Sequence, residues 1–233
     1  MRNHVAGRIA FLRILGFVVL AATASSSKAD GHDVDPAAMA RASIAHLEGA
    51  SSISADIHVA EEAVLSSGLK IKALREGKVL LQRTEGKHGF LFSRKGALLD
   101  QSMSYDGERL YMVGHTAQAS VSIAATGNLD EVMDNMIAAG AYLPGRDLLY
   151  TDAAAGLLED VLDSSYGGLM PVNGRACHYL TFRGPDVDWH LWVDAETELP
   201  CRYQVTSKWL TAAPEFEMLF SNWNLNKDVD TSK

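Results

Sequence analysis

The sequence predicts an α+β protein in which a curled antiparallel sheet, an open half-barrel, is covered by helices. Three observations predict this fold class: long stretches of alternating apolar and polar residues, amphipathic helical segments that interrupt them, and a C-terminal third made almost entirely of strands. A half-buried strand alternates with a period of two residues, whereas a helix that packs on a sheet repeats its apolar residues every three or four positions.

The N-terminus has the pattern of a secretory signal peptide. Three arginines precede an uncharged apolar run at residues 14–22, and small residues follow. That run is shorter than the roughly 20 residues that a membrane-spanning helix needs, so removal is expected rather than anchoring. We expect cleavage after Ala29, which makes residues 1–29 the signal peptide and residues 30–233 a single domain in the periplasm.

The charge of the chain argues against two classes of partner. The precursor carries a formal net charge of −8, and the expected signal peptide holds only basic charges, so the mature protein is more negative still. A surface of that sign repels nucleic acid and anionic lipid headgroups. No cysteine directly follows the cleavage point, so a lipid anchor is not expected. Removal of the short apolar run also leaves no integral membrane segment expected after processing.

Strands and helices can be assigned in order from Asp35, which is a suitable N-cap for a helix over residues 36–48. From Ser52 the pattern changes to the alternation of a strand. Residues 69–83 continue this pattern, with Gly77 as an expected kink or bulge. Shorter strands follow at Phe90–Arg94, Ser102–Tyr105, Arg109–Val113 and Ser120–Ala124, with Asp106 and Gly107 as a hairpin turn.

Two further helices interrupt the sheet. The first, residues 128–139, has Asn128 as its N-cap and Glu131 three residues later, which is the pattern of a capping box. The second is expected to start at Asp152. Its apolar face should consist of Leu157, Leu158, Val161 and Leu162.

The last third reads as a meander of strands at residues 177–183, 189–194, 201–209 and 215–223. If residues 184–187 form a loop, Arg183 lies opposite Asp188. Matching of apolar faces then places Phe182, Leu180 and His178 opposite Trp189, Leu191 and Val193, and Tyr203 and Val205 opposite Leu191 and Trp189.

The same register bears on the two cysteines. It sets Cys201 opposite Val193 and Cys177 opposite Asp194, so the thiols lie two strands apart, about 9 to 10 Å, and on opposite faces. A disulfide needs Cα atoms within roughly 7 Å and side chains that converge. We therefore expect two free cysteines, although secreted cysteines are ordinarily paired.

One polar cluster is a candidate catalytic or metal site: Asp186, Asp188, His190 and Asp194 around Trp189 and Trp192. Its members alternate with apolar residues, as on the solvated face of a strand, and a zinc site needs three or four converging ligands. We therefore expect no metal, no cofactor and no enzyme activity.

The strings GRACHYLTFRGPDVDWHLWVDAETELPCRYQVTSKW at residues 174–209 and LFSNWNLN at residues 219–226 resemble a family of predicted periplasmic proteins, domain of unknown function 2092. That family is similar in fold to the periplasmic lipoprotein-carrier superfamily, the LolA and LppX-like proteins. The resemblance implies a half-barrel whose helices close over an apolar cavity. Its members typically continue beyond the Ser-Asn-Trp-Asn string, so one sheet edge is expected to lack its cover here.

Three functions follow from these observations. The first is a periplasmic binding or carrier protein for a lipid, an acylated protein or another apolar ligand, and the second is an interaction or sensor module. An enzyme of unknown type ranks third. For the first, we assign to the cavity lining the sheet residues Ile57, Tyr105, Leu110, Met112, Leu180, Phe182, Trp189, Leu191 and Val205, and the helix residues Val132, Met133, Met136 and Ile137.

Export gives the first testable prediction. The mature protein should begin at Asp30, or at Ser25 if the earlier small-residue site is used, and should be recovered in the soluble periplasmic fraction. N-terminal sequencing of the purified protein checks this. A sequence that starts at Met1 in a membrane pellet would contradict it.

Overall fold

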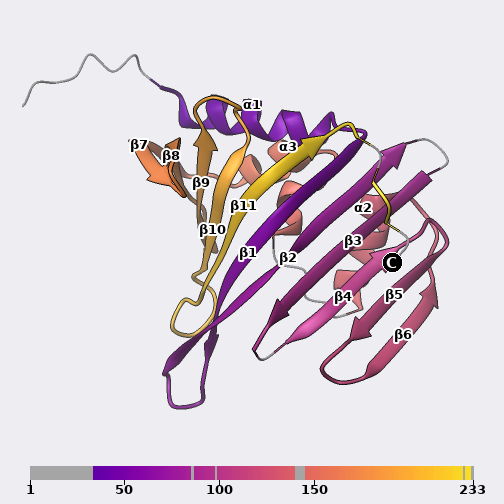
Figure 1. Cartoon of the computed structure of the whole chain (residues 1–233). Helices are drawn as coiled ribbons and strands as arrows, with labels where there is room; N and C mark the ends of the chain where they lie inside the picture. The colour runs from indigo at the N-terminus through magenta and orange to yellow at the C-terminus, as the bar shows by residue number, and fades with distance from the viewer. Residues whose placement is uncertain (1–33, 85–86, 98, 140–144, 228, 232–233) are drawn as a thin grey trace, which may run out of the picture. The chain divides into compact units, whose positions relative to one another are not determined.

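Eleven strands form one continuous antiparallel sheet in the computed structural model (Figure 1). The structure describes residues 34–84, 87–97, 99–139, 145–227 and 229–231, so the expected signal peptide lies outside the described residues. The strands are β1 Ser52–Val64, β2 Lys70–Thr84, β3 Lys87–Gly96, β4 Asp100–Tyr105, β5 Arg109–Gly114, β6 Ala119–Ala124, β7 Asp163–Val172, β8 Arg175–Arg183, β9 Val187–Asp194, β10 Pro200–Ser207 and β11 Glu215–Leu225. The helices are α1 Pro36–Glu48, α2 Leu129–Ala138, the short 3₁₀ helix η1 Arg146–Leu148, and α3 Ala153–Glu159.

The chain builds the sheet as two meanders that meet at its centre. Strands β1 to β6 run outward to one edge, and the helical segment from α2 to α3 carries the chain across to the other edge. Strands β7 to β11 then run back, and β11 pairs with β1, with Ile57 opposite Phe220. The C-terminal strand β11 is therefore not a sheet edge, because it has neighbours on both sides.

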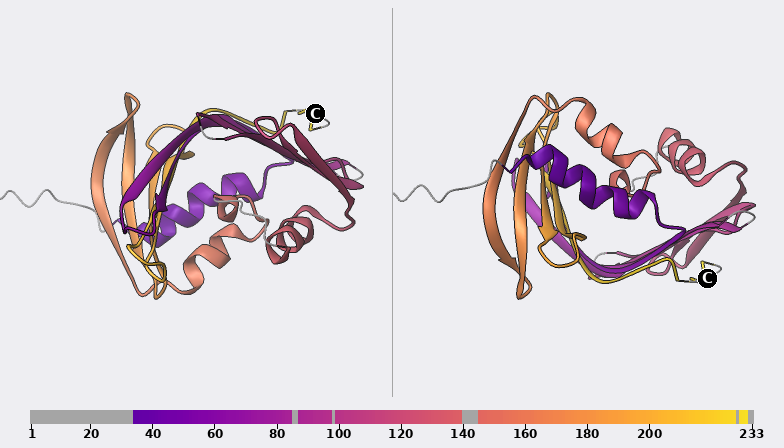
Figure 2. Two further views of the ribbon diagram at one scale, coloured as in Figure 1. Left: turned by 90° about the horizontal axis from the view of Figure 1, so that it is seen from below. Right: turned by 90° about the horizontal axis from the view of Figure 1, so that it is seen from above.

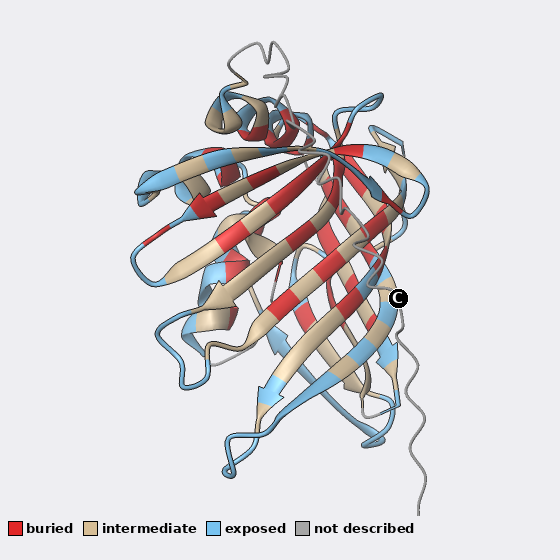
Figure 3. Ribbon diagram, turned by 90° about the vertical axis from the view of Figure 1, so that its left-hand side faces the viewer, coloured by how far each residue is buried: buried red, intermediate tan, exposed pale blue. Residues whose placement is uncertain are grey.

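The sheet curls around the helices, which lie on its concave face (Figure 2). Side chains that alternate along each strand turn apolar groups inward, so buried bands cross the sheet in successive strands (Figure 3). In β1, for example, Ile53, Ala55, Ile57 and Val59 are all buried. This arrangement confirms the predicted fold class, an α+β half-barrel covered by helices.

The helix starts and most of the C-terminal register are also as predicted. The Asp35 carboxylate accepts hydrogen bonds from the backbone of Ala37 at 2.9 Å and Ala38 at 3.1 Å, and Asn128 and Glu131 form a reciprocal capping box. In the C-terminal meander most predicted pairs occur: Arg183 with Asp188, Phe182 with Trp189, Leu180 with Leu191, His178 with Val193, Cys177 with Asp194, Tyr203 with Leu191, and Val205 with Trp189. The predicted pair of Cys201 with Val193 is wrong, because Pro200 lies opposite Val193.

Three local predictions were wrong. Strand β7 was not expected, because Gly167, Gly168 and Pro171 interrupt its alternation. Helix α3 ends at Glu159, so Leu162 lies beyond it and is exposed. Gly77 makes neither a kink nor a bulge in the register; instead, a Cβ atom there would lie 1.7 Å from the carbonyl oxygen of Ser93, so the close approach of β3 requires glycine.

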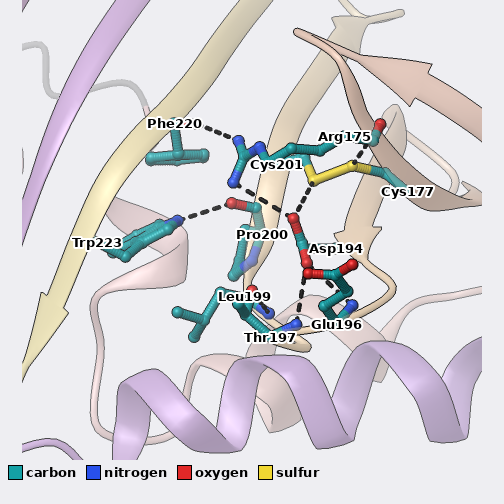
Figure 4. Close-up of a disulfide and its surroundings, with 10 residues drawn as sticks. All are labelled: Arg175, Cys177, Asp194, Glu196, Thr197, Leu199, Pro200, Cys201, Phe220 and Trp223. Atoms are coloured by element: carbon teal, nitrogen blue, oxygen red, sulfur yellow. Dashed lines mark hydrogen bonds and ion pairs between the residues drawn. A yellow bond between two sulfur atoms is a disulfide. The ribbon is translucent and has the colours of Figure 1, made fainter.

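The expectation of free cysteines was also wrong, because Cys177 and Cys201 form a disulfide with Cα atoms 6.8 Å apart (Figure 4). Pro200 pairs with Val193 but Arg202 pairs with Trp192, so Cys201 is the extra residue of a β-bulge. A bulge rotates the residue that it inserts out of the strict alternation. Cys201 therefore joins Cys177 in a small buried cluster on the convex face, separate from the main core.

Asp194 and Arg175 lie beside this disulfide (Figure 4). Arg175 lies 3.4 Å from the Asp194 carboxylate and donates to the backbone oxygen of Phe220 at 2.7 Å, which connects β8, β9 and β11. Burial acts to raise the pKa of Asp194, but hydrogen bonds from the backbone N–H groups of Thr197 and Glu196 outweigh it, so the pKa is lowered. The carboxylate thus stays charged opposite Arg175.

One guanidinium connects the sheet to the helices. Arg83 of β2 donates to the backbone oxygens of Leu47 at 2.7 Å and Glu48 at 3.3 Å, at the end of α1, and also to that of Leu149, which follows η1. Burial lowers the pKa of Arg83, and the charges of Asp130 and Glu48 oppose this change. The side chain therefore ties α1 and the segment before α3 to one strand.

The disulfide gives a prediction about stability. Denatured but unreduced protein should show no free thiol. The sequence separation of 24 residues implies that the double variant Cys177→Ala/Cys201→Ala loses about 3 kcal/mol of unfolding free energy. Urea denaturation followed by circular dichroism measures the loss. A thiol titration that finds both cysteines free would contradict the bulge as well as the bond.

Replacement of Arg83 tests the connection between sheet and helices. Arg83→Met keeps the aliphatic length but leaves buried carbonyl oxygens without their charged donor, so we expect a loss of about 2 to 3 kcal/mol in urea denaturation. Arg183→Met is the matched control, since its ion pair with Asp163 is solvent-exposed and should contribute less than about 1 kcal/mol. Equal effects of the two changes would show that Arg83 has no special structural role.

Candidate functional site

Two rows of apolar side chains cross the concave face from the centre of the sheet toward the β6 edge. They follow the cross-strand pairs: the first row is Leu81, Phe90, Tyr105, Leu110 and Ile123, and the second is Val79, Phe92, Met103, Met112 and Val121. The exposed fraction rises along both rows, from 0% at Leu81 to 49% at Ile123 and from 2% at Val79 to 52% at Val121. The rows thus leave the core and emerge at the edge of the sheet.

Helix α2 lies above the point where the rows emerge, and polar contacts hold it there. The Tyr150 hydroxyl donates to Asp134 at 2.7 Å and accepts from Nε of Arg146 at 3.2 Å, and the backbone N–H of Thr151 donates to Asp130 at 3.1 Å. Burial, followed by the hydrogen bond to Asp134, raises the pKa of Tyr150 to about 12, so its hydroxyl remains a donor. The polar side of α2 is fixed to the segment that leads into α3.

Between α2 and the β5–β6 hairpin the surface is hollowed into a cavity of about 490 Å³, which we call the edge groove. It is lined by Leu110, Met112, Ile123, Ala124, Ala125, Thr126, Val132, Asn135, Met136 and Ala139. None of these residues is charged, and a cavity of this size lies within the usual range for small-molecule sites. Such a lining can hold an apolar chain but offers no charged partner for a polar headgroup.

Only some of the residues that the sequence assigned to one cavity line the edge groove, although all of them belong to or pack against the main core. Leu110, Met112, Val132 and Met136 line the edge groove. The others belong to or pack against the main core: Ile57, Tyr105, Met133, Ile137, Leu180, Phe182, Trp189, Leu191 and Val205. The Phe182 and Trp189 rings, for example, stack with centroids 3.8 Å apart. Of the lining residues that the sequence analysis did not assign, Ile123 lies on a predicted strand, Ser120–Ala124, and pairs with Leu110 in the structure.

Comparison with known proteins identifies the family. The sequence profile described as "Predicted periplasmic protein (DUF2092)" matches residues 37–233. The chain belongs to this family. The family description confirms the periplasmic localisation expected from the sequence. No curated protein sequence matches the chain.

Solved structures share the fold at low sequence identity. Lipoprotein LppX of Mycobacterium tuberculosis aligns with a TM-score of 0.53 and 11% identity over 84% of this chain and 98% of that one. LprF of Mycobacterium bovis aligns with a TM-score of 0.53 and 14% identity over 85% of this chain and 96% of that one. These likenesses establish a shared LppX-like fold, as the resemblance implied. Among the helices that the structure describes, none is long and apolar enough to cross a membrane.

The polar cluster weighed as a catalytic site does not converge, since its members have different partners. Asp188 binds Lys208 at 2.7 Å, Nδ1 of His190 lies 2.7 Å from the Tyr179 hydroxyl, and Asp194 faces Arg175. Burial lowers the pKa of His190, so its ring is neutral at neutral pH. Within the described ranges, the one grouping with metal-ligand spacing is Cys177, Asp194 and Cys201, whose sulfur atoms are bonded to each other.

A second hollow, of about 760 Å³, lies between the β1–β2 hairpin and the loop from β10 to β11. Its lining includes the carboxylates of Glu61, Glu62 and Glu215. Glu62 forms an ion pair with Lys70 at 2.9 Å and accepts a hydrogen bond from the backbone N–H of Glu215 at 3.0 Å. This carboxylate therefore already connects the β1–β2 hairpin to the loop between β10 and β11. The edge groove is the better candidate for an apolar ligand.

Proposed function

We propose that the protein is a periplasmic binding or carrier protein for a ligand with an apolar chain, such as a lipid or an acylated protein, and that the chain lies in the edge groove. The observation that carries this proposal is the uncharged groove of about 490 Å³, placed where two apolar rows emerge from the core. When an alkyl chain binds there, the apolar surface of the chain and that of the groove are both removed from water. This burial contributes about 0.8 kcal/mol of binding free energy per methylene group.

The lining suits a ligand whose chain is variable rather than fixed in shape. Met112 of β5 and Met136 of α2 both line the groove. Methionine side chains are unbranched and adapt to irregular neighbours. The polar end of the ligand remains at the opening of the groove, because the groove has no charged residue to bind it. There it is in contact with water or, for an acylated protein, attached to that protein.

A second candidate, an interaction module without a transported ligand, is favoured by a different feature. The edge strand β6 is exposed along its whole length, and Val121 and Ile123 present apolar side chains there. An exposed apolar strand edge is a typical protein-binding surface.

A charge in the groove tests the carrier proposal. Met112 is only half-buried, so Met112→Arg should fold normally while it places a charge where the ligand chain must lie. We expect an affinity for a fluorescent fatty acid at least about tenfold lower than that of the wild type, measured by fluorescence titration.

The control is Val113→Arg, which introduces the same charge on the same strand but on its opposite face. It should leave the affinity unchanged, and circular dichroism should show both variants folded. Absence of probe binding by the wild-type protein, or equal weakening by both variants, would overturn the carrier proposal. Mass spectrometry of small molecules that copurify with the native protein would then identify or exclude a natural ligand.

A further inference from the structure

The free edge of β6 has a defined hydrogen-bonding pattern. The backbone N–H of Ala125 donates to the Glu108 oxygen at 2.9 Å, which fixes the residues of β6 that face β5. In an antiparallel ladder the backbone groups point alternately to either side. Ser120, Ser122 and Ala124 therefore turn their backbone N–H and C=O groups outward, where no strand of the described residues pairs with them. The Ser122 backbone oxygen accepts one hydrogen bond there, from the Arg109 guanidinium at 3.4 Å, and keeps a second lone pair for a strand.

The two edges of the sheet differ in how they are protected. The edge strand β7 has a register break between Tyr166 and Leu169, a proline at Pro171 and an exposed acid at Asp163. Bulges, prolines and charges are the usual means by which proteins prevent pairing at sheet edges. Strand β6, with the sequence ASVSIA, has none of the three, and its register with β5 is unbroken. Its edge is thus left open to pairing.

We propose that β6 pairs with β6 of a second copy of this chain, antiparallel and centred on Ser122, so that two sheets join into one. In this register Ser122 meets Ser122 of the second copy, and Ser120 meets Ala124, with hydrogen bonds through the backbone groups that face outward. On the concave face Val121 meets Ile123 of the second copy, an apolar cross-strand pair.

Self-complementarity and charge are what favour a second copy as the occupant. The order of side chains in β6 reads the same in both directions from Ser122: an apolar residue on each side, then a small one. Copies of this acidic chain repel one another, but β6 itself has no charged residue, and the nearest charged side chain is the basic Arg109, which donates to the Ser122 hydroxyl at 2.9 Å. Pairing also covers side chains that are 52% and 49% exposed in one copy, Val121 and Ile123.

The apolar rows of the two copies become continuous across this contact. Ile123 pairs with Leu110 within its own copy, and Val121 pairs with Met112. The concave faces and their edge grooves then lie side by side. The inference does not depend on what the groove binds. A contact of one short strand buries less than the roughly 1,200 Å² of a stable interface, so a dissociation constant on the order of 10 to 100 µM is expected.

Cysteine cross-linking tests the register. The native cysteines are bonded to each other, so Ser122→Cys introduces the one free thiol of the chain. In the proposed dimer the two Cys side chains lie on Cα atoms about 5.5 Å apart, close enough for a disulfide. Ser120→Cys is the matched control, since its Cα atoms would be about 14 Å apart. Mild oxidation should give a covalent dimer of the first variant and little or none of the second.

Sedimentation velocity tests the association without a new thiol. The wild type should shift from monomer to dimer between about 5 and 200 µM. Ser122→Pro removes an outward N–H and leaves the ladder with β5 intact, so this variant should remain monomeric and folded. Two results would overturn the proposal: a wild type that is monomeric throughout this range, which would leave the edge to a different partner, or equal cross-linking of the two cysteine variants.

Discussion

The placement of the helices on the sheet depends on one buried guanidinium. The last carbonyl groups of a helix have no partner within it, and Arg83 supplies donors to those at the end of α1 and to Leu149 before α3. A buried cation is costly unless it is paired, and Glu48 and Asp130 provide the negative charge. Asp130 belongs to α2, so the same site that holds α1 also attracts the start of α2. The helices are thereby fixed on the concave face of the sheet (Figure 2).

The helices leave the β6 margin of the concave face uncovered. Leu110 is buried beneath α2, but its neighbour Ile123 is half exposed, and the edge groove lies at this boundary. Binding of any partner that removes this apolar surface from water is favourable. A ligand chain in the groove and a strand added to β6 do so in different ways, because the first contacts side chains between α2 and β5 and the second contacts the outward backbone of β6. The two occupants do not exclude each other.

Periodicity predicted most strands because each has one buried face, and the pairing of Trp189 with Phe182 followed from matching those faces. The bulge at Cys201 could not be predicted, since one inserted residue changes the face of a side chain without changing the pattern around it. Strand β7 was not predicted, because its glycines and proline interrupt the alternation of apolar and polar residues. The sequence identifies apolar faces, but which of them the helices cover depends on contacts such as those of Arg83, far apart in the chain.

The two halves of the sheet are stabilised unequally. Strands β8 to β10 hold the disulfide, stacked rings of Tyr179 and Trp192 with centroids 4.5 Å apart, and Arg202 at 4.4 Å above Trp192. The described residues of β5 and β6 take part in no disulfide or ring stack. Segments with fewer such contacts open more readily, and binding regions are commonly drawn from them. Strands β5 and β6 can therefore adjust to a ligand chain or an added strand more readily than β8 to β10.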